Sequence, residues 1–125
     1  MPEDLKAIYQ RLYDVLQQYV PPLNPKVEGM GRYDLYAMHE VTLQGRSYPE
    51  LFFAGLGARK GYTGLYFFPV YTHPEEFKAV SPALKKCLKG KSCFHIKTLN
   101  NGLLEDINAM LAAGFAFYKD KGLIK

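Results

Sequence analysis

The most restrictive feature of this chain is a pair of strand-like segments that are apolar on both faces. Leu51–Leu56 and Tyr62–Val70 contain aliphatic, aromatic and small residues and no charged residue. Two apolar faces are typical of strands at the centre of a sheet. Gly57-Ala58-Arg59-Lys60-Gly61 lies between them and predicts a hairpin loop, because glycine at each end supplies positive φ angles. We therefore expect an antiparallel sheet built around this hairpin.

A third strand is predicted before this pair, over Tyr33–Leu43. Its odd positions are mostly apolar and its even positions are mixed, which is the alternation of a half-buried strand. The odd positions carry Tyr33, Leu35, Ala37, His39, Val41 and Leu43. A turn over Gln44–Ser47 would connect it to the central pair, so the three strands form an antiparallel meander.

Two long helices are predicted at the ends of the chain. From about Glu3 to Val20, apolar residues recur at steps of three and four, which indicates an amphipathic helix. A second helix starts at a cap on Asn100 or Asn101 and runs to about Lys121. Its middle, Ala109–Tyr118, is apolar nearly all round, which predicts either deep burial or contact with another chain.

Shorter elements complete the predicted order. Thr72–Glu75 matches a capping box, and Ser81 is a cap with Pro82 at the first helical position. A last strand follows over Lys91–Lys97. The order of helix, three strands, short helices, strand and helix predicts a single α+β domain over residues 1–125. We expect an antiparallel sheet of about four to five strands, with the N- and C-terminal helices packed on one face.

Composition limits the classes of function. The net charge of +4 is too small on its own to indicate a nucleic-acid partner. No window of about 18 apolar residues exists, so no membrane span is expected. The chain starts with acids where a secretory signal carries basic residues, and its two cysteines form no disulfide framework. These features favour a cytoplasmic protein with reduced thiols.

The predicted strand Lys91–Lys97 is the first candidate site. Its apolar face carries Phe94 and Ile96, which we expect in the core. Its other face carries Lys91, Cys93, His95 and Lys97. Nearby cations would lower the pKa of the Cys93 thiol, and a cysteine–histidine pair supplies two ligands for a soft metal. The alternative is a solvated or packed strand face with no chemistry.

Lysines are concentrated around this strand. Between Phe77 and Leu104 there are six lysines and no Asp or Glu. This asymmetry predicts a positive surface that docks a small anionic ligand or an acidic protein partner, with a merely solvated surface as the alternative. The candidate binding residues are Lys85, Lys86, Lys89, Lys91, Cys93, His95 and Lys97, with Arg59 and Lys60 at the hairpin tip.

Glycines at positions 55, 57, 61 and 64 superficially resemble a phosphate-binding loop. They lie in and between hairpin strands, whereas such loops join a strand to a helix. Hairpin geometry explains Gly57 and Gly61. Gly55 and Gly64 mark either a bulge or a place where another group approaches the backbone.

The segments Gly55–Tyr71 and Leu88–Lys97, the second with its Gly-Lys-Ser-Cys-Phe run, resemble the YdhG-like family of domains of unknown function. The resemblance covers about residues 26 to 122. It implies a fold similar to frataxin, with helices packed on an antiparallel sheet. One bacterial member is described as an intracellular iron chaperone, so the resemblance also implies iron handling.

Iron binding of the frataxin type uses carboxylates on the first helix and the adjoining sheet edge. The matching acids here are Glu3, Asp4, Asp34 and Glu40. They form no dense cluster, so iron is implied by the resemblance alone. Three hypotheses follow: a non-enzymatic iron-handling protein, a module that docks an anionic ligand or acidic partner, and an enzyme that uses Cys93 with help from His95. The apolar segment Ala109–Tyr118 is also compatible with a homo-oligomer.

Overall fold

A computed structural model describes residues 5–29, 31–38, 40–43, 45–77, 81–90 and 92–124, with the backbone alone for 27–29. The elements are α1 (Leu5–Leu16), the 3-10 helix η1 (Gln17–Tyr19), β1 (Asn24–Gly29), β2 (Arg32–Ala37), β3 (Val41–Leu43), β4 (Arg46–Tyr48), β5 (Leu51–Arg59), β6 (Tyr62–Phe67), α2 (Pro69–Thr72), the 3-10 helix η2 (Pro74–Phe77), α3 (Pro82–Cys87), β7 (Leu88–Lys89), β8 (Cys93–Ile96) and α4 (Asn101–Asp120).

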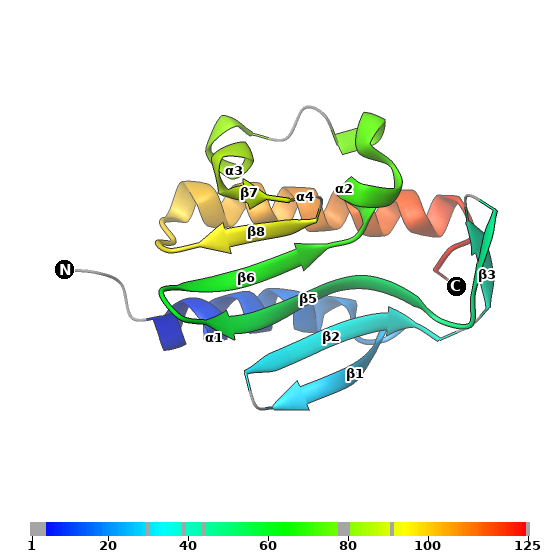
Figure 1. The fold of residues 1–125 in the computed structure, drawn as a ribbon, viewed down its shortest axis with the longest axis horizontal. Coiled ribbons are helices and arrows are strands. Elements are labelled where there is room, and N and C mark those ends of the chain that lie inside the picture. The colour runs from blue at the N-terminus through cyan, green and yellow to red at the C-terminus, as the bar shows by residue number, and fades with distance from the viewer. Residues whose placement is uncertain are drawn as a thin grey trace.

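Within the described residues, six strands form one antiparallel sheet in the order β1-β2-β5-β6-β8-β7 (Figure 1). Five of these strands have four or more residues, and β7 has only two. The apolar strands β5 and β6 occupy the centre of the sheet. The predicted α+β class and antiparallel sheet are confirmed, with β7 as a short addition at one edge.

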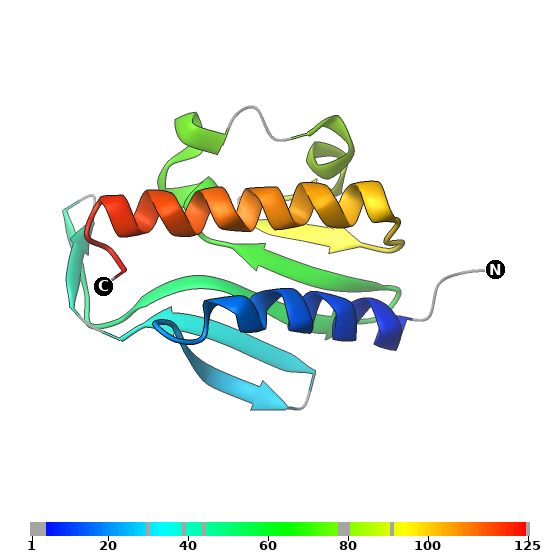
Figure 2. The same cartoon turned by 180° about the vertical axis from the view of Figure 1, so that it is seen from behind.

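α1 and α4 lie against the same face of the sheet, as predicted (Figures 1 and 2). The core fills the space between the two layers. Its fully buried residues include Leu12, Leu16, Leu35, Phe53, Leu56, Phe67, Phe94, Ile96, Leu111 and Tyr118. Phe94 and Ile96 are thus core residues, as their alternation predicted. None of the helices in the described ranges combines the length and the apolar composition that crossing a membrane requires.

α4 begins and ends where its sequence signals place it. The Asn100 side chain accepts a hydrogen bond from the Leu103 amide at 2.7 Å, and Gly122 follows the helix with a φ of 76°. Phe115 packs on Phe53, with ring centroids 6.1 Å apart. The outward positions are small and exposed: Ala109, Ala112, Ala113 and Ala116. The helix is apolar all round because alanines fill its solvent side, while its large side chains pack within the chain.

Several predicted boundaries are wrong. The strand predicted over Tyr33–Leu43 ends at Ala37, and Val41–Leu43 pairs with β4 in a separate two-stranded sheet. The predicted loop Gly57–Gly61 is shorter, because β5 continues to Arg59 and the turn is made by Lys60 and Gly61. β1 was not predicted at all. Its pairing with β2 is irregular, with a register shift between Pro25 and Val27.

The predicted capping box at Thr72–Glu75 is also wrong. Thr72 is the last residue of α2 rather than the start of a helix. Its hydroxyl lies 2.6 Å from the buried Tyr118 hydroxyl and 2.9 Å from His73 Nδ1. It therefore links α2 to α4. The predicted cap on Ser81 is confirmed, since its side chain accepts a hydrogen bond from the Leu84 amide at 3.1 Å.

Candidate binding site on the open face of the sheet

The face of the sheet opposite α1 and α4 brings together polar residues from four strands. In the described part of the chain, no helix lies across β5 and β6 on this side (Figure 1). Residues directly opposite one another in an antiparallel pair point to the same face. The register therefore aligns one row of side chains: Asp34, Gly55, Tyr66, Cys93 and Lys89. We call this side the open face.

A second row on the open face contains Arg32, Gly57, Gly64 and His95. Three glycines from the two rows thus lie together at its centre. A Cβ added to Gly55 would lie 2.3 Å from Asp34 Oδ1, and one added to Gly64 would lie 3.1 Å from the Tyr66 hydroxyl. The prediction that another group approaches the backbone at these two positions is confirmed. Side chains of Asp34, Arg59 and Tyr66 lie over these glycines, which are buried.

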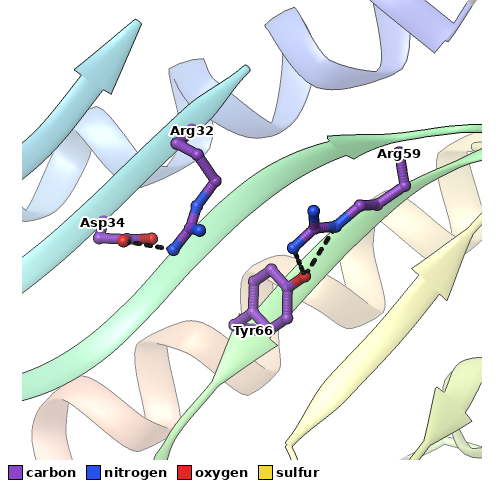
Figure 3. Close-up of polar contacts among 4 residues, drawn as sticks. All are labelled: Arg32, Asp34, Arg59 and Tyr66. Atoms are coloured by element: carbon purple, nitrogen blue, oxygen red, sulfur yellow. Dashed lines mark hydrogen bonds and ion pairs between the residues drawn. The ribbon is translucent and has the colours of Figure 1, made fainter. Parts of the chain in front are cut away.

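A pocket of about 240 Å³ lies on the open face. It is lined by Arg32, Asp34, Tyr36, Phe52, Arg59 and Tyr66. Arg59 donates from Nε and Nη2 to the Tyr66 hydroxyl, at 3.2 and 2.9 Å. Arg32 Nη2 donates to Asp34 Oδ2 at 2.7 Å. Figure 3 shows Arg32 extending from β2 to the Asp34 carboxylate, and Arg59 extending from the end of β5 to the Tyr66 hydroxyl.

Asp34 is the most unusual residue of the pocket. It is only 4% exposed, and its Oδ1 has no hydrogen-bond partner among the described residues. A buried acceptor without a partner costs about 1–3 kcal/mol, and more when it is charged. Nearby, burial and then the Asp34 charge raise the pKa of Tyr36, so that phenol remains protonated. Asp34 also lines the pocket, so a buried carboxylate oxygen without a partner lies at its border.

A larger pocket of about 350 Å³ lies between the start of α1 and the tip of the β5–β6 hairpin. Leu5, Tyr9, Ala58 and Tyr62 are among its lining residues. Among the described residues it contains no buried side-chain nitrogen or oxygen without a partner, because that property is confined to Asp34. The smaller pocket therefore has the stronger sign of a specific ligand.

Cys93 and His95 both lie on the open face, as their spacing predicted, but outside the lining of this pocket. The His95 ring stacks on Tyr62, with centroids 3.9 Å apart and an interplanar angle of 16°. Burial raises the pKa of the Cys93 thiol, and a hydrogen bond with Tyr66 and the Arg59 charge offset only part of this. The predicted lowering of that pKa by lysines is therefore wrong, because desolvation outweighs the nearby cations.

The predicted lysine surface is spread over several elements of the fold. Lys85 and Lys86 are exposed in the last turn of α3, away from the open face. Lys89 lies opposite Cys93 on β7 and therefore on the open face. Lys60 is exposed in the turn after β5, and Lys97 is exposed just after β8. Lys91 lies outside the described residues. Of the predicted binding residues, Arg59 alone lines the pocket of the open face.

Of the predicted metal ligands, Asp34 and Glu40 lie within the described residues, and the structure places them differently. Asp34 lies buried on β2, whereas Glu40 is exposed beyond the end of that strand. Glu3, Asp4 and His39 lie outside the described residues. No group of three or more His, Cys, Asp or Glu side chains suited to a metal ion occurs within the described ranges. Iron handling stays a prediction that depends on the resemblance.

Sequence reasoning missed Arg32 and Tyr66 as site residues and considered Asp34 only as a metal ligand. The signal for Tyr66 was present in the alternation Tyr62, Gly64, Tyr66, which places two aromatic rings and a glycine on one face. Arg32 carried no such signal, because its position depends on how β2 aligns with β5. The register between two strands cannot be predicted from the sequence of one strand alone.

Comparison of the chain with family models, with curated proteins and with solved structures found no match. The resemblance to the YdhG-like family is therefore a prediction, and the likeness to frataxin is one as well.

Proposed function

We propose that this protein is a non-enzymatic binding module that holds a small anionic ligand on its open face, between Arg32 and Arg59. The observation that supports this proposal is that two arginines line one pocket on a face of the sheet that no described helix covers (Figure 1). The ligand class is the anion predicted from the sequence, but the proposed binding residues are Arg32 and Arg59 rather than the lysines.

The charges of the pocket favour an anion. Its lining holds two arginines and one aspartate, which leaves one positive charge in excess. A guanidinium is a planar group with five donors that matches carboxylate and phosphate oxygens. Two donors of Arg59 are used by the Tyr66 hydroxyl, which fixes the direction of the remaining ones. A cation held in place before binding loses less conformational freedom when the ligand arrives.

The other hypotheses have less support from the described residues. A nucleophilic cysteine needs a lowered pKa, and burial raises the pKa of Cys93. Iron needs several oxygen ligands, and the described acids do not converge. A partner that docks on exposed Lys85 and Lys86 would gain little from each contact, since exposed ion pairs contribute about 0–1 kcal/mol.

The test is an amide NMR titration of the protein with inorganic phosphate and with benzoate. We expect saturable shifts that are concentrated on β2, β5 and β6. A charge-assisted hydrogen bond contributes about 1.5–3 kcal/mol, so Arg59→Gln should weaken binding roughly 10- to 100-fold.

Lys60→Gln is the matched control, because it removes the same charge one residue away and outside the pocket lining. It should change the affinity less than about threefold, as exposed charges do. Shifts that follow ionic strength without saturating, or an equal loss in both variants, would contradict the proposal.

A further inference from the structure

We infer that the ligand of the open face is a planar aromatic acid that also carries a neutral hydroxyl or N–H group, which donates to Asp34 Oδ1. This inference depends on the proposed function and adds the chemical class of the ligand. It combines the unpaired oxygen of Asp34, the ion pair with Arg32 and the shape of the pocket.

Two contacts restrain the Asp34 carboxylate. The Asp34 side chain is only 5% exposed, and its other oxygen accepts from Arg32 at 2.7 Å. Oδ1 lies over Gly55, where even a methyl group would collide with it. Asp34 also lines the pocket, so a ligand bound there would lie against this side chain. A ligand donor would therefore satisfy an acceptor that the folded chain leaves without a partner.

The donor should be neutral rather than an ammonium group or a metal ion. The Arg32 guanidinium already balances the charge of Asp34. A further cation on Oδ1 would be repelled by Arg32 and Arg59, which both line the pocket. A metal ion would need several oxygen ligands, and the described residues supply no such group. A hydroxyl or a ring N–H meets the requirement without adding charge.

The shape of the pocket favours a flat ring. Its lining includes the rings of Tyr36, Phe52 and Tyr66. Tyr36 and Phe52 pack together, with centroids 5.4 Å apart, and so form one continuous aromatic wall. A cavity of roughly 150 Å³ is enough to bind benzene. The pocket of about 240 Å³ therefore has room for one ring with an acidic substituent and a donor.

The experiment compares matched ligands on the same protein by calorimetry and amide NMR. The probes are benzoate, 3- and 4-hydroxybenzoate and the two corresponding methoxybenzoates, which keep the ring and the acid but lack the donor. We expect at least one hydroxybenzoate to bind about tenfold or more tightly than both benzoate and its methoxy counterpart. In Asp34→Asn this preference should fall to about threefold or less, because an amide oxygen is a weaker acceptor than a carboxylate.

The outcomes separate the inference from the proposed function. If all five acids bind with equal affinity, the donor inference is overturned while anion binding stands. If none of them binds saturably, the proposed function fails first. If Asp34→Asn does not fold, the comparison of hydroxy and methoxy ligands on the natural chain decides the inference alone.

Discussion

Replacing Gly114 by alanine tests how tightly α4 is packed against the sheet. Gly114 lies on the buried side of the helix, and a Cβ there would be 2.4 Å from Cζ and 2.7 Å from Cε1 of Phe67. The Phe67 ring is fully buried between Phe53 and Phe77, at centroid distances of 5.9 and 5.3 Å. An ordinary contact needs at least 3.4 Å, so the ring or the helix would have to move by about 1 Å.

Two opposing effects decide the sign of the change. Alanine is a better helix former than glycine by about 1 kcal/mol. Forcing an extra carbon into a packed core costs about 1–3 kcal/mol. The enclosed Phe67 ring places Gly114→Ala near the upper part of that range, so we expect a net loss of about 1–2 kcal/mol. For a domain of this size, that loss lowers the Tm by roughly 3–10 °C.

Urea denaturation followed by far-UV circular dichroism measures this change. Gly102→Ala is the matched control in the same helix, because its Cβ would meet only Asn100 Oδ1, at an ordinary 3.5 Å. We expect this control to be neutral or to stabilise by up to about 1 kcal/mol. The reasoning is refuted if Gly114→Ala is as stable as the natural chain or more stable.

Two further predictions follow from the pKa shifts. Burial and the charge of Lys121 lower the pKa of His73 below its ordinary 6.5, and Glu76 offsets part of this. The unfolded chain therefore takes up this proton at a higher pH than the folded one. Stability should fall as the pH drops from about 6.5 towards the lower folded pKa. His73→Gln should reduce the slope of the urea midpoint against pH in this range. An unchanged slope would show that His73 does not cause the loss of stability. In a Cys87→Ser variant, Cys93 should react with iodoacetamide at pH 7.5 more slowly than a free cysteine, because burial raises its pKa. Alkylation faster than that of free cysteine would show an activated thiol instead.

The fold class was predictable because the strongest patterns are local. The apolar strands β5 and β6 and the capped helix α4 can each be predicted from the residues of that segment alone. β1 was missed because it begins with Asn24, Pro25 and Lys26, which are unusual residues for a strand. The strand predicted to reach Leu43 was too long, because alternation continues past the point where pairing with β5 ends.

The site was harder to predict than the fold, since it depends on register. Asp34 and Tyr66 are far apart in the sequence, and both lie opposite Gly55 only because β2, β5 and β6 align as they do. The glycine spacing did indicate a close approach to the backbone. It could not identify which side chain makes that approach.

The two edge strands of the sheet affect the tendency of the protein to aggregate. At one edge, Pro25 has no N–H to donate, the register shifts at that point, and Lys26 is exposed. At the other edge, β7 offers only two residues, one of them the exposed Lys89. Interrupted pairing, proline and lysine are the features that discourage a sheet from recruiting strands of another molecule. Within the described residues, the protein thus combines a partly aromatic face that no helix covers with sheet edges that disfavour pairing with strands of another molecule.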